Sequence, residues 1–257
     1  MSIIPFVYYC KYMKLIVINS NSAGNAYALD TGKDILLLES GCKMADVKRA
    51  IDFRISDVVG CVVTHEHGDH AKYSVEYAKF GVEVYGVTDI GVKKNFPFGK
   101  FHPLQEGKTK HIGSFDVVPF SNHHDVPIFG YLIRHPEFGV MLFSTDSYKI
   151  GITLTGIDHF LIEANYSDEL LKQNVWDGKI NKAQADRIML SHMSLEYCIN
   201  YLRSCGADKS AKTITLCHLS ERNSDSKLFR DTVAGSFGVP CYCATKGLVV
   251  ELSKENI

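Results

Sequence analysis

Three histidines and two acidic residues fall within seven positions, in the stretch THEHGDH at residues 64–70. The stretch follows the apolar run VVGCVV, a pattern that predicts a buried strand ending in a polar turn. Burying these polar groups together is costly unless each of them finds a partner. A bound cation is such a partner, because imidazole and carboxylate are donors that Zn²⁺, Mn²⁺ and Fe²⁺ accept. An incidental, solvated turn is the alternative interpretation.

The spacing within this turn indicates two neighbouring metal positions. His65 and His67 are two residues apart, so their side chains project the same way from an extended segment. Gly68 permits a sharp bend, after which Asp69 and His70 point elsewhere. The turn would therefore offer two nitrogen donors to one point, and an oxygen and a nitrogen to a second.

The turn resembles the H-x-H-x-D-H signature of the metallo-β-lactamase fold. The resemblance implies an α/β protein with a four-layer αββα sandwich and a dinuclear metal site at one sheet edge. It also implies three later ligands, for which the candidates are His124 in NHHDVP, Asp146 in LFSTDS and His218 in LCHLSERN. Adjacent strand residues point to opposite faces, so we expect His124 to be the ligand and His123 to contact a ligand or face solvent.

Four further segments, NSNSAGNAYAL, IEANY, RIMLSHMS and CHLSERNSD, are similar to the YycJ/WalJ-like subgroup of this fold, which is related to RNase Z and RNase J. The resemblance extends over residues 13–252. The usual GHLSN of the subgroup reads SHMSL here, so Ser191 and Leu195 depart from the pattern. His192 is retained, and the resemblance implies that it faces the scissile phosphate as a proton donor. A helix-capping or core histidine is the alternative.

The resemblance assigns seven residues to two metal ions, one held by His65, His67 and His124, the other by Asp69, His70 and His218, with Asp146 bridging both. Such a pair of ions can share a hydroxide, because the metals lower the pKa of bound water to about 7. Asp69 would orient this hydroxide, and His192 would protonate the leaving oxygen. Zinc is the expected metal, and manganese or iron would accept the same ligands.

Phosphodiester hydrolysis is the predicted reaction, and the subgroup implies an exonuclease acting on single-stranded DNA. The net charge of −1 and the lack of an inserted clamp domain of the RNase J type favour a smaller substrate instead. A cyclic-nucleotide phosphodiesterase is therefore an alternative, with Tyr148, Tyr166 and Trp176 as aromatic contacts. A lactone or thioester hydrolase, or a metal-bearing binding protein without turnover, remains compatible with the same residues.

Short strands and helices alternate along the 257 residues, and neither a linker nor a repeat separates them. The predicted strands cover residues 14–20, 25–30, 34–40, 58–64, 82–86, 111–120, 128–135, 139–145, 157–165, 212–220, 239–245 and 247–252. The predicted helices cover residues 42–53, 72–80, 182–190, 194–205 and 225–237. We expect one domain over residues 13–257, preceded by an N-terminal extension over residues 1–12.

The extension and the cysteines bear on where the protein acts. Residues 1–12 are apolar but too short for a membrane span, so we expect no membrane association, and the apolar start suggests a homodimer contact. No pair of the eight cysteines has C-x-x-C spacing, which favours reduced thiols and a cytoplasmic protein.

The lysines between residues 93 and 110 form either a basic patch or a solvated loop. The other histidines, His102, His111, His135 and His159, are expected in loops or on the surface.

Overall fold

A computed structural model of the chain describes residues 13–253. Its first sheet has seven strands in the order β15-β1-β2-β3-β4-β5-β6, and β3 to β6 run parallel. The strands are β1 (Met13–Asn21), β2 (Gly24–Asp30), β3 (Ile35–Leu38), β4 (Val58–Val63), β5 (Val84–Gly86), β6 (Phe101–Pro103) and β15 (Val249–Leu252). Strand β3 is buried along its whole length and β4 from Gly60 to Val63, as parallel strands covered on both faces require, and neither strand contains a polar side chain.

The second sheet has the order β11-β8-β9-β10-β12-β13-β14, with β7 paired to β8. Its strands are β7 (Lys110–Ile112), β8 (Phe115–His123), β9 (Phe129–His135), β10 (Gly139–Ser144), β11 (Lys149–Ile150), β12 (His159–Glu163), β13 (Thr213–Cys217) and β14 (Cys241–Cys243). Strands β10, β12, β13 and β14 are parallel. Their carboxyl ends therefore lie at one edge of the sheet.

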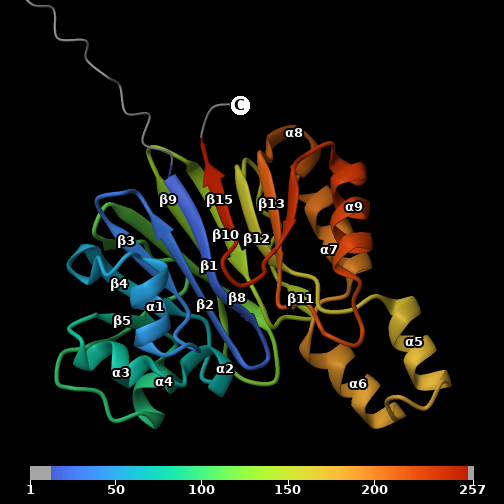
Figure 1. Cartoon of the computed structure of the whole chain (residues 1–257), viewed down its shortest axis with the longest axis horizontal. Helices are drawn as coiled ribbons and strands as arrows, with labels where there is room; N and C mark the ends of the chain where they lie inside the picture. Colours follow the sequence, from blue (N-terminus) through green and yellow to red (C-terminus); the bar gives the residue numbers. More distant parts are fainter. Residues whose placement is uncertain (1–12, 254–257) are drawn as a thin grey trace, which may run out of the picture.

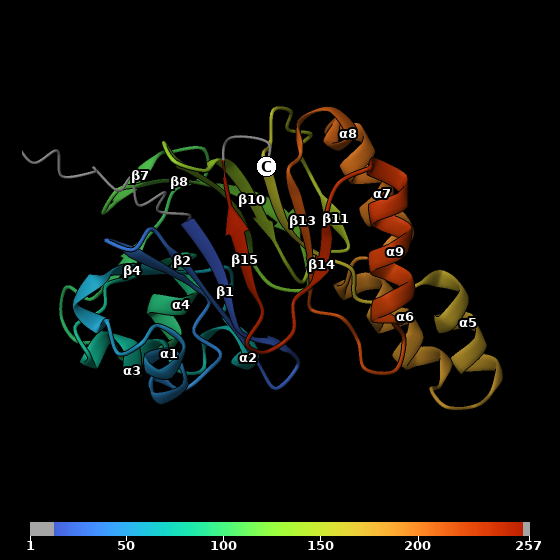
Figure 2. The same ribbon diagram turned by 45° about the horizontal axis from the view of Figure 1, so that its top comes forward.

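Helices cover the outer face of each sheet (Figures 1 and 2). Beside the first sheet lie α1 (Met44–Ala50), the 3₁₀ turn Ile55–Asp57, α2 (Gly68–Ala71), α3 (Ser74–Lys79) and α4 (Thr88–Lys93). Against the second sheet lie α7 (Leu195–Ser204), α8 (Ala207–Ser210) and α9 (Ser226–Phe237). The pair α5 (Asp168–Trp176) and α6 (Lys182–Ser191) projects beyond the end of the second sheet.

Three apolar cores fill the spaces between these layers. Tyr27, Tyr131 and Phe143 pack between the two sheets. A second core joins the first sheet to its helices, and a third joins the second sheet to α7 and α9. The arrangement confirms the predicted four-layer αββα sandwich.

The segment predicted as one strand over residues 111–120 is a hairpin. Strands β7 and β8 pair antiparallel across it, and Gly113 at the turn has φ +56°. A Cβ atom at Gly113 would also meet the Val59 side chain at 2.6 Å. The apolar alternation continues through the turn, so periodicity alone did not reveal it.

Two histidines expected on the surface are buried in strands. His159 is 1% exposed, and its Nδ1 lies 2.8 Å from Thr213 Oγ1, while its Nε2 lies 3.1 Å from the backbone oxygen of Ser253. His135 is 8% exposed and stacks on Phe138. A histidine with both ring nitrogens paired fits a core strand as well as a surface loop.

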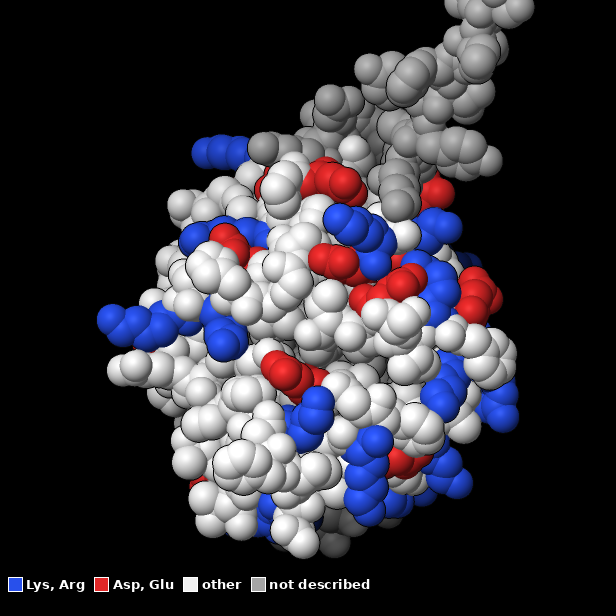
Figure 3. Space-filling model, turned by 90° about the vertical axis from the view of Figure 1, so that its left-hand side faces the viewer, with Lys and Arg blue, Asp and Glu red and all other residues white. Residues whose placement is uncertain are grey.

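Lysine side chains on the face shown in Figure 3 are interspersed with acidic ones. In the predicted lysine-rich stretch, Lys93 pairs with Glu66, Lys100 donates to the Gly81 oxygen, and Lys110 lies over the Tyr85 ring. These local contacts support a solvated loop over a basic patch. Among the helices of residues 13–253, none has the length and apolar character to span a bilayer.

Seven cysteines within residues 13–253 are free thiols, as predicted: Cys42, Cys61, Cys198, Cys205, Cys217, Cys241 and Cys243. The proposed N-terminal extension and the homodimer contact fall on residues 1–12, outside the described residues.

Candidate metal centre and active site

The candidate centre lies where the parallel strands of both sheets end. Glu39 follows β3 and His65 lies two residues beyond β4 in the first sheet, while Asp146 and His218 follow β10 and β13 in the second. Glu39, Asp146 and His218 have φ values of +64°, +48° and +53°, a left-handed conformation that is uncommon for these residue types. Such strain, about 1–3 kcal/mol at each residue, persists only where the surroundings enforce it, and it clusters at functional sites.

The structure brings the seven predicted ligands together in two groups that share Asp146. The first group is His65, His67, His124 and Asp146, and the second is Asp69, His70, Asp146 and His218. Within each group one donor atom from every residue lies within 4.8 Å of the others. This division is the one that the sequence spacing predicts, with two histidines of the turn in one group and Asp69 and His70 in the other.

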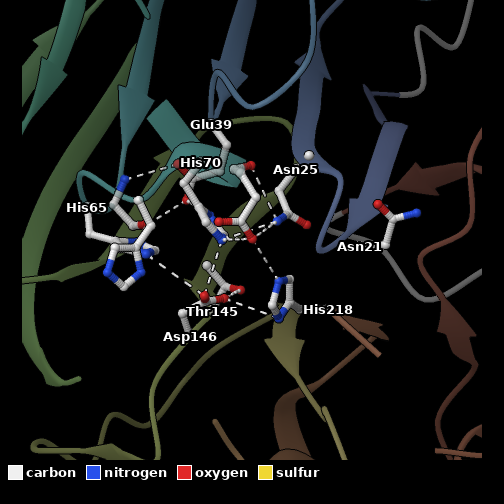
Figure 4. A network of polar contacts seen from close by, with 12 residues as sticks. Asn21, Asn25, Glu39, His65, His70, Thr145, Asp146 and His218 are labelled. Carbon is white, nitrogen blue, oxygen red and sulfur yellow. Dashed lines mark hydrogen bonds and ion pairs between the residues drawn. The ribbon is translucent and has the colours of Figure 1, made fainter. Parts of the chain in front are cut away.

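Asp146 occupies the position between the groups (Figure 4). Its Oδ2 lies 3.3 Å from His70 Nε2 and 3.8 Å from His65 Nε2, and its Oδ1 lies 3.3 Å from His218 Nδ1. A carboxylate with both oxygens directed at different imidazoles can bridge two cations. In the first group, His124 Nε2 lies 3.2 Å from His67 Nδ1.

Charge and hydrogen bonding in the cluster fit a divalent cation. His65 Nε2 is buried and has no hydrogen-bond partner within the described residues, and burial lowers the pKa of His65 well below its usual value. A neutral imidazole with a free lone pair is the form that binds a metal. Burial opposes protonation of His218 as well, yet Asp146 and Asp69 raise its pKa to about 10. The carboxylates thus favour a positive charge in the cluster. A bound metal cation would provide that charge in place of a proton on His218.

Glu39 and Thr64 orient two of these histidines. The Thr64 hydroxyl lies 2.6 Å from Glu39 Oε1 and 2.9 Å from His65 Nδ1, so it can donate to the carboxylate and accept from the imidazole. That arrangement places the His65 proton on Nδ1 and directs the bare Nε2 into the cluster. Glu39 Oε1 also lies 3.3 Å from His70 Nδ1. The sequence interpretation assigned no role to Glu39, which directly follows the apolar run ILLL, because the family resemblance singled out Asp146 and no feature of the sequence singled out Glu39.

Glu163 is a second buried acid that the sequence interpretation missed. Its Oε1 lies 2.7 Å from His192 Nδ1 and 3.1 Å from His218 Nδ1, and its Oε2 accepts from the backbone N–H groups of Ser147 and Met193. Burial opposes protonation of His192, but Glu163 raises its pKa above the usual value. Glu163, His192, His218 and Asp146 also form a third group of potential ligands.

His192 ends α6 as its C-cap residue, and its ring lines a pocket over the cluster. The backbone of His192 therefore caps the helix, as the alternative interpretation expects, and its N–H donates to the Ile188 oxygen. Its side chain contacts Glu163 and lines the pocket. The pocket has a volume of about 430 Å³. Its lining includes the candidate ligands His67, Asp69 and His124, and the arginines Arg187 and Arg222.

Several other predicted contacts lie elsewhere. His123 is exposed beside Tyr148, as expected for a residue that is not a ligand. Tyr166 packs in a small apolar cluster and Trp176 is exposed, and the lining of the 430 Å³ pocket includes neither of them nor Tyr148. The predicted aromatic contacts to a cyclic nucleotide are therefore missing from this pocket.

The two departures from the subgroup pattern have structural explanations. His124 Nδ1 lies 3.0 Å from the backbone oxygen of Ser191, a contact that any residue at position 191 can make. Leu195 is 6% exposed and packs in the core beneath α7. Position 195 is therefore a packing position in this chain.

Comparisons with known proteins agree with this architecture. The chain is 30% identical over 240 residues to the exodeoxyribonuclease WalJ of Streptococcus pneumoniae, with 86% of each chain covered. It is 27% identical over 237 residues to the exodeoxyribonuclease YycJ of Bacillus anthracis, covering 85% of this chain and 86% of that protein. The metallo-β-lactamase fold protein YhfI of Bacillus subtilis superposes with a TM-score of 0.73 at 16% identity, covering 93% of this chain and 99% of YhfI. No protein-family model matches the sequence.

The similarity to WalJ extends over most of both chains, and the superposition on YhfI shows the fold independently. Together with the grouped histidines and acids, these relationships indicate a divalent-metal site. The chain belongs to the WalJ/YycJ family of metallo-β-lactamase-fold hydrolases.

Proposed function

We propose that this protein is an exodeoxyribonuclease that hydrolyses phosphodiesters of single-stranded DNA at a dinuclear metal centre. The observation that carries the proposal is the convergence of seven imidazole and carboxylate donors, shared through Asp146, beneath a pocket that also contains His192. The relatives WalJ and YycJ are named exodeoxyribonucleases, which supports DNA as the substrate.

The first ion would be held by His65, His67 and His124, and the second by Asp69, His70 and His218, with Asp146 between them. Two bound divalent ions supply an activated water near neutral pH and neutralise charge on the phosphoryl oxygens. Zinc is the proposed metal, because mixed imidazole and carboxylate donors suit it, and manganese or iron would fit the same set.

The protein's own residues would position the water and move the proton. Asp69 lines the pocket, and its Oδ2 lies 3.3 Å from His70 Nε2 and 3.4 Å from His218 Nε2, where it can accept a hydrogen bond from the attacking water. His192 holds one proton on the nitrogen that faces Glu163, and the opposite nitrogen remains for the leaving oxygen. Because Glu163 raises the pKa of His192 and so favours the doubly protonated ring, the opposite nitrogen, Nε2, can carry a second proton and donate it to the leaving oxygen, while Nδ1 keeps its own.

The direct test offers the metal-loaded protein 5′-labelled single-stranded DNA alongside a panel of cyclic nucleotides. We expect progressive shortening of the DNA, and we expect Asp69→Ala to abolish it. Cleavage of a cyclic nucleotide with intact DNA would contradict the proposal. Inactivity on both substrates would also contradict the proposal. Lactones and thioesters would then be the next substrates to test.

Adjacent histidines give a matched pair of variants for the ligand set. His124 lies in the cluster, whereas His123 is exposed outside it. His124→Ala should lower the bound metal by about one ion per chain and reduce DNA hydrolysis by at least about a hundredfold. His123→Ala should retain both. Equal effects of the two substitutions, measured by elemental analysis and DNA hydrolysis, would contradict the assignment.

A further inference from the structure

Two arginines line the same pocket as the candidate metal ligands. Arg187 lies on α6 and Arg222 lies in the loop after β13, and both line the pocket that contains His192. Within residues 13–253, neither guanidinium forms an ion pair or a side-chain hydrogen bond. By contrast, Arg49, Arg54 and Arg230 each form an ion pair with an aspartate. A free guanidinium beside a phosphodiester site is available for a phosphate.

A second hollow adjoins the pocket at Arg222. It has a volume of about 280 Å³ and shares His192, His218 and Arg222 with the main pocket. The two hollows are therefore adjacent, and the candidate proton donor His192 lines both. A linear substrate could occupy both hollows, whereas a small cyclic substrate would fill only one.

The helical pair that carries Arg187 also carries exposed apolar side chains. Trp176, the last residue of α5, is 87% exposed, and Leu190 on α6 is 64% exposed. Trp176 precedes the pocket-lining residue Ile180 by four positions, so their Cα atoms lie within about 14 Å of each other. A stacked strand covers that distance in about four nucleotides at 3.4 Å each. Exposed aromatic rings beside cationic side chains are the common means of binding single-stranded nucleic acid.

We propose that α5, α6 and the loop after β13 form the binding track for a single DNA strand. Arg187 and Arg222 pair with phosphates that flank the one being hydrolysed, and Trp176 stacks on an unpaired base. This inference rests on the proposed function and adds to it the contacts that hold a polymer. It also offers a way for a chain with a net charge of −1 to bind DNA, through a few specific groups and without an overall excess of positive charge; on the face shown in Figure 3, basic and acidic side chains are interspersed.

Trp176 is the only tryptophan in the sequence, so its fluorescence reports on this position alone. The metal-loaded protein would be titrated with a thymidine oligonucleotide of about twelve residues, made with phosphorothioate linkages that resist hydrolysis. We expect quenching of the fluorescence on binding. Arg187→Gln and Arg222→Gln should each weaken binding about tenfold and reduce the slope of log affinity against log salt by about 0.7.

Arg134→Gln is the matched control, because Arg134 is exposed on β9 and lies outside the pocket lining. It should leave both binding and the salt slope unchanged. For Trp176→Ala, the anisotropy of a labelled strand should show binding weakened by about tenfold, since stacking contributes about 1–3 kcal/mol per base. Arg134→Gln should also leave the hydrolysis of bis(p-nitrophenyl) phosphate unchanged.

The outcomes separate this inference from the proposed function. If the wild-type protein cleaves single-stranded DNA but Arg187→Gln and Arg222→Gln bind it as tightly as the wild type, the arginine contacts are overturned. The proposed function then stands. Strand binding by anisotropy without any change in tryptophan fluorescence would overturn the stacking role. Failure of the wild-type protein to bind or cleave the strand would overturn both proposals together.

Discussion

At the scale of single residues, proton placement depends on two buried acids. Thr64 connects Glu39 to His65 and leaves Nε2 of that histidine bare, while Glu163 holds a proton on His192. The histidines were predictable because three of them stand together in one turn. The two acids were not, since an acid after an apolar strand looks the same in sequence whether it enters a site or meets solvent.

Replacing Glu163 by Gln should shift the pH dependence of hydrolysis. Glu163 raises the pKa of His192 against the effect of burial, so the donor form is present at low pH and is lost as pH rises through the raised pKa. Without the carboxylate that loss begins at lower pH. We expect about a tenfold fall in kcat near pH 8 and a smaller fall near pH 6.

The pH–rate profile of Glu163→Gln on single-stranded DNA is the measurement. Because Glu163 also contacts His218, the metal content of the variant must be measured in parallel. A uniform fall in kcat across the pH range, at full metal content, would show that Glu163 does not set the protonation of His192.

At the scale of elements, the turn that carries four candidate ligands is held by close backbone packing. Residues 68–71 form the short helix α2, so the direction of Asp69 and His70 comes from a helical turn that begins at Gly68. The sequence predicts that Gly68 permits a sharp bend, yet its φ is not positive and a Cβ at this position would meet nothing within 4 Å. The glycine that matters is Gly41, whose added Cβ would lie 1.8 Å from the Asp69 backbone oxygen.

Gly41→Ala and Gly68→Ala therefore form a contrasting pair. The Cβ at position 41 meets backbone atoms of Asp69 and Asn25, which no side-chain rotation can relieve, so the turn must shift. We expect Gly41→Ala to lower the free energy of unfolding by about 1–3 kcal/mol and to weaken metal binding, and Gly68→Ala to change neither adversely. Urea unfolding and chelator competition measure both. Loss of metal from Gly68→Ala alone would contradict this account.

Other elements show where sequence patterns were insufficient. Helix α5 was not predicted, because only Leu171 and Asn174 of it are buried and its apolar period is weak. Its start is nevertheless visible in retrospect, since Ser167 caps it by accepting from the Leu170 N–H. Helix α5, which was not predicted, and α6, which was, together form the part of the fold to which we assign the strand contacts.

At the scale of the whole molecule, the candidate centre joins the two sheets. His65, His67, Asp69 and His70 come from the first sheet side, and His124, Asp146 and His218 come from the second. The layered fold was predictable through the family resemblance of the turn and the later motifs. Strand order and register were not, because they depend on long-range pairing, which local sequence periodicity does not encode.

Because the ligands come from both sheets, metal should stabilise the folded protein. At a thousandfold excess over its dissociation constant, each ion contributes about 4 kcal/mol. A chelator should therefore lower the melting temperature by about 8–16 °C for each ion removed, at about 2–4 °C per kcal/mol. The control is Asp146→Ala, which lacks the shared ligand and should respond much less. Equal melting temperatures with and without chelator in the wild-type protein would contradict a centre that joins the sheets.

The central claim is that two metal ions share Asp146 at the joined edge of the two sheets. Anomalous diffraction at the zinc absorption edge, from crystals of the zinc-loaded protein, tests it most directly. We predict two peaks about 3.5–4 Å apart, one within bonding distance of His65, His67 and His124 and the other of Asp69, His70 and His218. A single peak, or a peak held instead by Glu163 and His192, would contradict the account.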